Sequence, residues 1–185
     1  DLPDNPDASY TFTLAVNDGV LDSDPDAVVV TVNRKPVADA GADKTVNECD
    51  GSLSLDGSVS SDPDGDALIY QWTAPAGITL SDPSAASPSI DLPANPEASY
   101  EFTLVVSDGA CDSDPDAVVI TVNRKPLADA GEDKTVDEGD TGVGLDGSGS
   151  SDPDGDPITY LWTPPAGITL SDPTVVNPTF DVPAD

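Results

Sequence analysis

Hydrophobic and polar positions alternate along the chain with the period of a β-strand. In residues 100–106 (YEFTLVV) the side chains at every second position, starting from Tyr100 and Phe102, are apolar. Because successive strand side chains point to opposite faces, this pattern predicts a strand with one buried face. Residues 118–122 (VVITV) alternate in the same way, and the Asp-rich turn between the two runs predicts a β-hairpin.

Shorter apolar runs bounded by Gly, Pro, Asp and Ser precede this hairpin, and no segment has helical periodicity. About seven strands in such a length are typical of an immunoglobulin-like β-sandwich, with Trp72 expected to fill its core. The predicted fold class is therefore all-β. The earlier strands are expected around residues 37–46 with a kink at Gly41, and around residues 52–55, 68–72, 78–80 and 89–92.

The same pattern recurs at a fixed offset of 90 residues. Residues 33–44 read NRKPVADAGADK, residues 123–134 read NRKPLADAGEDK, and the offset carries Trp72 onto Trp162. Repeats near this length indicate an array of small domains and not one large core. The sequence therefore predicts tandem immunoglobulin-like β-sandwiches of about 90 residues each.

This period divides the chain into three predicted segments. Residues 35–124 form a complete repeat, residues 1–34 correspond to the C-terminal strands of another, and residues 125–185 correspond to the N-terminal two-thirds of a further one. Either the chain is a window of a longer array, or subunits join head to tail. In the second case residues 1–33 of one copy supply strands to residues 125–185 of its neighbour.

The composition is strongly acidic. Thirty-six Asp and Glu residues stand against six Lys and Arg residues, which gives a formal net charge of −30. This charge excludes nucleic acid as a natural partner and favours cations. No run approaches the roughly 20 apolar residues of a membrane helix, so we expect no membrane insertion. The absence of Met and of a leader favours a mature or internal segment.

The chain resembles a known family over essentially its whole length. The runs AGADKTVNE, LDGSVSSDPDGDALIYQWTAPAGITLS, YEFTLVVSDG and DAVVITV follow one another in residues 40–122. In this order they resemble the PKD-type (polycystic-kidney-disease-type) immunoglobulin-like repeat of bacterial and archaeal surface proteins. The resemblance implies an extracellular or cell-surface module of spacers, adhesins, surface layers or accessory regions of secreted hydrolases. A shared fold does not decide among these roles.

Acidic loops recur with the repeat, as SDPDGD in residues 61–66 and again in residues 151–156. Carboxylates at alternate positions around a Gly turn let several oxygens converge on a hard cation such as Ca²⁺. The simpler interpretation is that Asp-Pro and Asp-Gly only favour turns. If calcium binds, we expect it to fix the loops and the angle between domains. The candidate metal ligands are Asp62, Asp64, Asp66, Asp112, Asp114, Asp116, Asp152, Asp154 and Asp156.

All six basic residues lie near predicted junctions. We expect them either to pair with the acidic loops and so orient the domains, or to serve solubility alone. These residues are Arg34, Lys35, Lys44, Arg124, Lys125 and Lys134.

Two cysteines occur together in the complete repeat. Cys49 and Cys111 replace residues that are Gly139 and Leu21 in the neighbouring segments, which makes them disulfide candidates in an oxidising compartment. The expected topology places them at opposite poles, roughly 25 Å apart, whereas a disulfide needs Cα atoms within about 7 Å. An intradomain bond, an interchain bond and free thiols all remain open.

The sequence predicts no enzymatic activity. The chain contains no His, which excludes imidazole metal sites and Ser-His-Asp triads. Acidic pairs are too abundant to identify a glycosidase site. A carbohydrate-binding module is the fairer alternative. The nine aromatic residues all fall on predicted strands, which leaves no ring for a sugar platform, and a solvent-exposed Trp72 would reverse that preference.

The sequence thus predicts a non-catalytic structural segment of an extracellular surface protein. It would act as a stiff, calcium-stabilised spacer or fibre, because the junctions carry Pro36 and Pro126 and no Gly/Ser tether. The expected partners are neighbouring repeats or copies of itself head to tail, and cell-surface or matrix components. The alternative is a carbohydrate-binding accessory module of a secreted hydrolase or adhesin.

Overall fold

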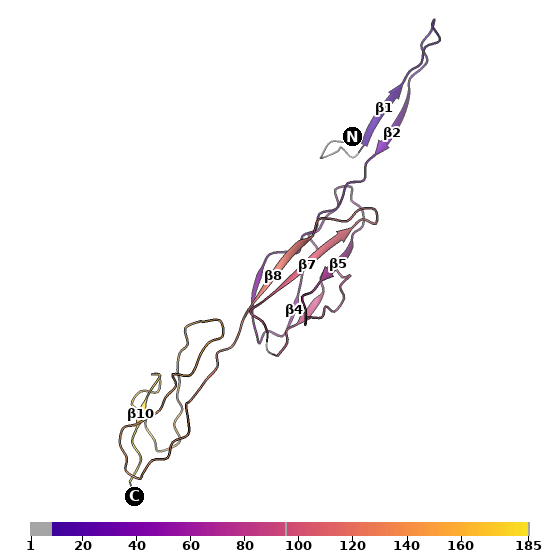
Figure 1. Cartoon of the computed structure of the whole chain (residues 1–185). Coiled ribbons are helices and arrows are strands. Elements are labelled where there is room, and N and C mark those ends of the chain that lie inside the picture. The colour runs from indigo at the N-terminus through magenta and orange to yellow at the C-terminus, as the bar shows by residue number, and fades with distance from the viewer. Residues whose placement is uncertain (1–8, 95, 185) are drawn as a thin grey trace. The chain divides into compact units, whose positions relative to one another are not determined.

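The computed structural model describes residues 9–94 and 96–184. Every regular element in these residues is a β-strand (Figure 1), which confirms the all-β prediction. Two compact units are present, one built from residues up to 45 with residues 50–121, and the other from residues 46–49 with residues 122 onward. The described residues hold no helix that could span a lipid bilayer.

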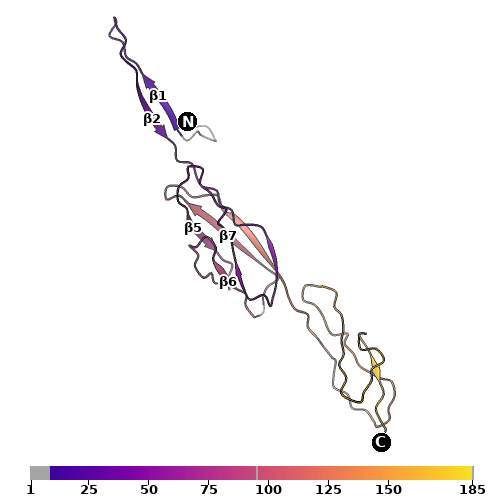
Figure 2. The same ribbon diagram turned by 180° about the vertical axis from the view of Figure 1, so that it is seen from behind.

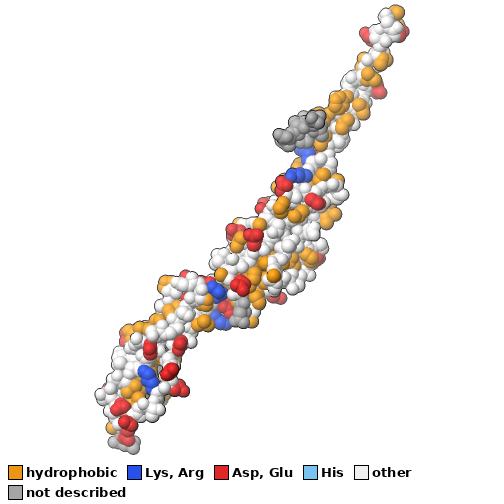
Figure 3. Space-filling view, in the orientation of Figure 1, with side chains coloured by type: hydrophobic (Ala, Val, Ile, Leu, Met, Phe, Trp, Pro, Cys, Tyr) orange, Lys and Arg blue, Asp and Glu red, His pale blue; other side chains and the backbone are white. Residues whose placement is uncertain are grey.

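The first described element is a hairpin of β1 (Ser9–Leu14) and β2 (Asp26–Thr31). The strands pair antiparallel, with Tyr10 opposite Val30 and Phe12 opposite Val28. One face of the hairpin is apolar but uncovered, since Phe12 is 59% exposed. Figure 3 shows hydrophobic side chains along this part of the surface.

The complete module contains two sheets (Figure 1 and Figure 2). The larger sheet has the order β3-β8-β7-β5, and β4 pairs with β6 in the smaller one. Side chains of β7 and β8 alternate between buried and exposed, as predicted from the sequence. The strands are β3 (Lys44–Asn47), β4 (Ser52–Ser54), β5 (Ile69–Thr73), β6 (Ser89–Asp91), β7 (Ser99–Ser107) and β8 (Asp116–Asn123).

The core of this module lies on the inner face of the β7–β8 pair. Phe102 of β7 is 0% exposed and Ile120 of β8 is 1% exposed. Trp72 of β5 is 3% exposed, so its predicted core position is confirmed. The Tyr100 hydroxyl accepts a hydrogen bond from the backbone N–H of Glu97 at 2.8 Å. This tyrosine corner at the start of β7 is typical of immunoglobulin-like sandwiches.

Two predicted strands are shorter than expected. The run around residues 37–46 contributes only β3 and an isolated bridge between Val37 and Ser61. Gly41 adopts φ +81°, a left-handed conformation that interrupts an extended chain. Residues 78–80 likewise contribute only a bridge from Leu80 to Ile90.

Residues 125–184 retain only part of the module's structure. β9 (Val143–Gly144) pairs with β10 (Thr179–Phe180), which are the 90-residue counterparts of positions in β4 and β6. Residues 134–137 and 159–163, the counterparts of β3 and β5, form no strand. In the complete module β3 and β5 pair with β8 and β7. In this segment the counterparts of β3 and β5 form no strands, because the strands that would pair with them are not among its residues. The counterparts of β4 and β6 still form, because they pair with each other.

The predicted division into residues 1–34, 35–124 and 125–185 stays a prediction. The boundary between the two compact units falls near residue 121, close to the second predicted junction, whereas no boundary between them falls near residue 34. Residues 1–8 of the first segment lie outside the described residues.

The β7–β8 hairpin is covered and the β1–β2 hairpin is not. We therefore expect a Phe→Ala substitution to reduce the free energy of unfolding by different amounts in the two hairpins. Phe102→Ala empties a closed core and should reduce the free energy of unfolding by about 3–5 kcal/mol. Phe12→Ala, at the counterpart position, should cost less than about 1 kcal/mol in dilute solution, because Phe12 is already largely hydrated. Urea unfolding of both variants measures this difference, and equal losses would contradict an uncovered face.

Candidate functional site

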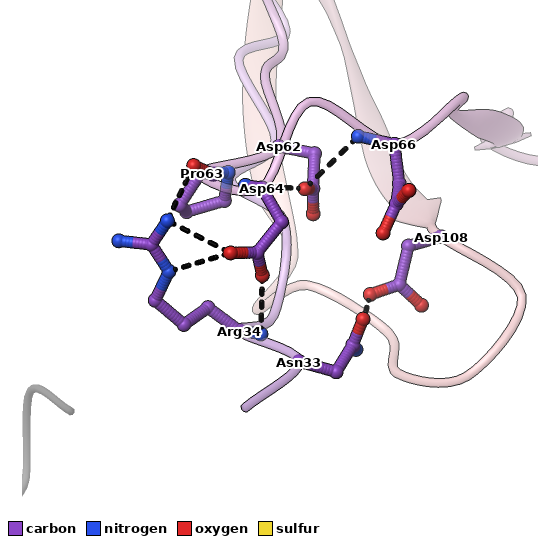
Figure 4. A network of polar contacts seen from close by, with 7 residues as sticks. All are labelled: Asn33, Arg34, Asp62, Pro63, Asp64, Asp66 and Asp108. Atoms are coloured by element: carbon purple, nitrogen blue, oxygen red, sulfur yellow. Dashed lines mark hydrogen bonds and ion pairs between the residues drawn. The ribbon is translucent and has the colours of Figure 1, made fainter. Parts of the chain in front are cut away.

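Arg34, which follows β2, binds the acidic loop of residues 61–66 in the complete module (Figure 4). Its backbone N–H donates to Asp64 Oδ2 at 2.6 Å, and its Nε and Nη2 donate to Asp64 Oδ1 at 2.9 and 2.8 Å. Nη2 also donates to the Pro63 carbonyl oxygen at 2.5 Å. We call this set of contacts the arginine clamp. It ties the segment leaving the hairpin to the loop of the module that follows.

The clamp is repeated 90 residues later. Arg124 donates from its backbone N–H to Asp154 Oδ2 at 2.6 Å and from Nε to Asp154 Oδ1 at 2.9 Å. Its Nη2 lies 2.8 Å from Asp154 Oδ1 and donates to the Pro153 carbonyl at 2.8 Å. The arginine and aspartate side chains are only 26% and 18% exposed, against 28% and 17% in the first clamp. Charge-assisted contacts of this planar kind are specific to Arg, since Lys presents a single point charge.

The loop itself is shaped to present the clamped carboxylate. Asp62 Oδ1 accepts the backbone N–H groups of Asp64 at 2.7 Å and Asp66 at 3.2 Å. Gly65 at φ +83° closes the turn, with its N–H donating to the Asp62 carbonyl at 3.2 Å. Only Gly adopts this left-handed conformation without strain. Asp62 Oδ1 therefore bonds the loop backbone, and Asp64 bonds Arg34.

The neighbouring residue reaches a second acidic turn. Asn33 Nδ2 donates to Asp108 Oδ2 at 2.8 Å, and Asp108 Oδ1 accepts the N–H groups of Ala110 and Cys111 at 2.7 and 2.6 Å. Figure 4 shows Asp66 and Asp108 on the side of the loop away from the Arg34 guanidinium. Residues 33 and 34 thus bind two acidic turns of one module.

These contacts keep the bonded carboxylates ionised. Hydrogen bonds from the Arg34 side chain and backbone hold the pKa of Asp64 below its ordinary 3.8, although desolvation and then the negative charge of Asp108 oppose the shift. The backbone N–H and then the guanidinium of Arg124 lower the pKa of Asp154 in the same way. The pKa of Asp108 is lowered mainly by the N–H of Cys111, followed by the Asn33 amide.

The other predicted ligands have separate partners. Asp116 Oδ2 accepts the backbone N–H of Ala40 at 2.7 Å, which fixes the start of β8 to the module's first turn. Asp114 forms an exposed ion pair with Lys35 at 2.6 Å. Asp112 lies in an isolated bridge to Ser107. In the second loop, Asp152 Oδ1 accepts the N–H groups of Asp154 and Asp156 at 2.8 and 3.2 Å, as Asp62 does in the first.

Among the residues that the structure describes, no three acidic or Cys side chains are grouped to hold a metal ion. The clamped Asp64 and Asp154 are directed at arginine. Calcium therefore stays a prediction, and its oxygens would come from those that the clamp leaves, such as the enclosed Asp62 Oδ2, which has no hydrogen-bond partner.

The remaining cations divide into two groups. Lys125 pairs with Glu48, with Nζ 3.2 Å from Oε1 and its backbone N–H donating to Oε2 at 3.0 Å, and these bonds lower the pKa of Glu48. Lys44 and Lys134 instead donate to the carbonyls of Ser54 and Gly144 at 3.1 and 2.5 Å. The expected pairing with the acidic loops thus holds for Arg34, Lys35 and Arg124. Lys125 pairs with Glu48 outside those loops, and Lys44 and Lys134 bond to carbonyl groups.

Cys49 and Cys111 are both free thiols and both exposed. Cys49 follows β3, and Cys111 lies in the turn between β7 and β8. An interchain disulfide stays a prediction.

The tyrosine corner, the buried Trp72 and the two-sheet order define the complete module as an immunoglobulin-like β-sandwich. Residues 40–122, which make up most of the complete module, match the family described as K319L-like, PKD domain. The predicted PKD-type family is therefore confirmed, and the PKD module is a non-catalytic one.

Relatives extend the similarity beyond this module. The mouse Dyslexia-associated protein KIAA0319-like protein is 32% identical over 176 residues, which cover 88% of this chain and 17% of that protein. Chitinase A of Pseudoalteromonas piscicida is 29% identical over 141 residues, or 74% of this chain and 17% of the enzyme. The chain thus spans about a sixth of the length of these relatives.

The fold is also shared with a solved structure, human Protocadherin-24 EC1-2. That structure has a TM-score of 0.51 at 13% identity, and the similarity covers 83% of this chain and 79% of that one. The predicted extracellular or cell-surface location is confirmed by the family match and the relatives named above.

The lowered pKa of Asp64 predicts a loss of stability in acid. Because the folded-state pKa lies below the unfolded value, the unfolded chain binds protons first as the pH falls. The clamp's contribution is present above the unfolded pKa of 3.8 and is lost as the pH falls through the folded value.

Asp64→Asn should therefore lower the melting temperature at pH 7 and remove part of its decline below pH 4. Glu101→Gln, which removes the same charge from the exposed face of β7, serves as the control. Identical pH profiles for the two variants would show that the clamp does not stabilise the fold.

Proposed function

We propose that this chain is a structural spacer segment of an extracellular protein, in which arginine clamps hold successive PKD-type modules stiffly. The recurrence of the clamp at Arg34 and Arg124 carries this proposal. In each case a residue just before a module's first bridge is fixed to that module's own loop by the same donor and acceptor atoms.

The segment that leads into the complete module has few free torsions. Asn33 is bonded to Asp108 and Arg34 to Asp64. Pro36 is fully buried, with its φ angle fixed by the ring. Val37 then exchanges two backbone hydrogen bonds with Ser61, at 2.8 and 3.0 Å. Consecutive anchors of this kind favour a stiff connection over a flexible tether.

A purely mechanical role fits the chemistry of the described residues. The groups with lowered pKa values are carboxylates bonded to N–H groups, hydroxyls or cations, which suits stabilisation better than proton transfer. The carbohydrate-binding alternative is less favoured, because Trp72 is buried and offers no platform for stacking a sugar. The similarity to a chitinase leaves room for the same spacer role within a polysaccharide hydrolase.

Two finer features belong to this proposal. Calcium would bind the acidic turns that the clamp does not neutralise, around Asp62, Asp66 and Asp108. Head-to-tail joining would complete residues 125–185 with strands from a neighbouring copy, since both the hairpin and this segment expose apolar side chains.

A distance measurement tests the stiffness. Spin labels at Thr11→Cys in β1 and Gln71→Cys in β5, with Cys49 and Cys111 replaced by Ser, should give a narrow distance distribution. Arg34→Ala should broaden it, because the clamp no longer fixes the connecting segment. Lys35→Ala removes an adjacent, exposed charge and should leave the width unchanged. Equal widths for all three proteins would contradict the spacer proposal.

A chelation experiment tests calcium. If calcium stabilises the acidic turns, the melting temperature should be higher in Ca²⁺ than in EDTA at equal ionic strength. Mg²⁺ should be less effective, because it demands a stricter octahedral geometry. An unchanged melting temperature after chelation rejects calcium while leaving the clamp intact.

A further inference from the structure

We propose that the β1–β2 hairpin of one copy of this chain seats on the open face of residues 125–184 of a second copy, in the register that β7–β8 has in the complete module. The inference rests on the proposed function and makes its head-to-tail joining specific to individual residue pairs.

The β1–β2 hairpin has the same strand register as β7–β8. Tyr10 faces Val30 and Phe12 faces Val28, as Tyr100 faces Ile120 and Phe102 faces Val118 at the 90-residue offset. The turn is the same as well. The Ser23 N–H donates to the Val16 carbonyl at 2.8 Å, and the Val16 N–H donates to the Ser23 hydroxyl at 3.0 Å. Ser113 and Val106 form the same two hydrogen bonds at the same distances. No refolding is needed before the hairpin can act as a donor.

Its apolar face carries the residues that form a core elsewhere in the chain. The side chains of Phe12, Leu14 and Val16 are 59%, 64% and 58% exposed, whereas their β7 counterparts are all 0% exposed. The three counterparts are Phe102, Leu104 and Val106. Removing this much apolar surface from water is the main driving force for association.

The receiving face is a groove of about 850 Å³ whose lining includes Ala130, Ile158, Tyr160 and Trp162. Two of these residues are more exposed than their counterparts in the complete module. Ala130 is exposed, although Ala40 at the matching position is 2% exposed, and Trp162 is only half-buried. The two flanking stretches, residues 134–137 and 159–163, have no strand partner. A hairpin placed between these two stretches would pair with one of them along each of its two edges.

A glycine marks where the donor side chain belongs. A Cβ built at Gly57 would lie 2.7 Å from Leu104 Cδ2, so the leucine packs directly on this glycine. At the counterpart Gly147, the atom at 3.4 Å is Cε1 of Tyr160. Beside Gly147 the tyrosine ring thus lies where the complete module has a leucine beside Gly57. Leu14 of the second copy is the residue that would take its place.

The complete module fixes the register of the joint. Gln71 of β5 faces Val105 of β7, and Trp72 faces Leu104. At the 90-residue offset, Leu161 faces Ala15 and Trp162 faces Leu14 across two copies. A polar contact is expected at the joint as well. In the complete module the Asp116 carboxylate accepts the backbone N–H of Ala40. At the 90-residue offset, Asp26 of one copy would accept the backbone N–H of Ala130 of the other.

The occupant is a second copy because donor and acceptor lie on the same chain. In the described residues, each copy presents one uncovered hairpin, β1–β2, and one open face in residues 125–184, so a joint uses different surfaces on the two molecules. Such heterologous contacts repeat and generate open chains unless a rotation closes them into a ring. The resulting assembly is an extended polymer with one joint per subunit.

Disulfide trapping in the full 185-residue protein tests the register. Ala15→Cys and Leu161→Cys, in a Cys49→Ser, Cys111→Ser background, should lie directly opposite at about 4.5–5.5 Å between Cα atoms, within the range that a disulfide needs. The control pair, Ala15→Cys with Thr163→Cys, is displaced by two residues along the same strand, to about 7–8 Å. Copper–phenanthroline oxidation should give a ladder of multiples of 18.8 kDa on a non-reducing gel for the first pair only.

A second measurement covers variants that crosslink poorly. Phe12→Asp places a charge on the donor face and should abolish oligomers in sedimentation velocity, whereas Thr11→Asp on the opposite face of β1 should retain them. The complete module should melt unchanged in both, since Phe102 supplies its own core.

Equal crosslinking of both cysteine pairs, crosslinked monomers without a ladder, or oligomers that persist in Phe12→Asp would each overturn the inference. If the ladder is absent but the spin-label distances remain narrow and sensitive to Arg34→Ala, the joint is wrong and the spacer proposal stands.

Discussion

The structure depends on covering the apolar face of one hairpin. β7 and β8 contribute Phe102, Leu104 and Ile120 to the core, and they also provide the edges on which β5 and β3 form. Where this hairpin is missing, in residues 125–184, the counterparts of β3 and β5 lose their strand pairing. The small β9–β10 pair survives because its two strands are both present. In this module the β7–β8 hairpin therefore both supplies the buried core side chains and pairs with β3 and β5 at its two edges.

Electrostatics impose the second constraint, because the chain has six cations for thirty-six acidic groups. Arg34 and Arg124 are used where a guanidinium can satisfy a carboxylate and a carbonyl together. The lysines that follow them form simpler ion pairs with Asp114 and Glu48. Several other carboxylates, such as those of Asp18, Asp56 and Asp82, bond to backbone N–H groups within their own turns, which stabilises these turns without any counter-ion.

The strands with strict alternation were predictable to within one or two residues, because one-sided burial leaves a period of two in the sequence. The break at Gly41 was visible only as a kink, since a single positive φ decides how much of that run can pair. Pairing of the arginines with the acidic loops was one expectation from their place near the junctions, but the particular contact between Arg34 and Asp64 was not predicted, because it depends on the shape of the loop. A further signal in the sequence is the 30-residue spacing that Arg34 and Asp64 share with Arg124 and Asp154. The calcium prediction rested on spacing alone, and spacing does not reveal that Asp64 faces an arginine.

The clamp has a consequence for how such a chain grows. In the predicted division Arg34 closes one repeat and Asp64 belongs to the next, and Arg124 and Asp154 are divided in the same way. Each junction therefore takes one half of its clamp from each of the two repeats that it joins. Duplication of the ninety-residue unit adds a complete clamp at every new junction, so reach and rigidity increase in the same step.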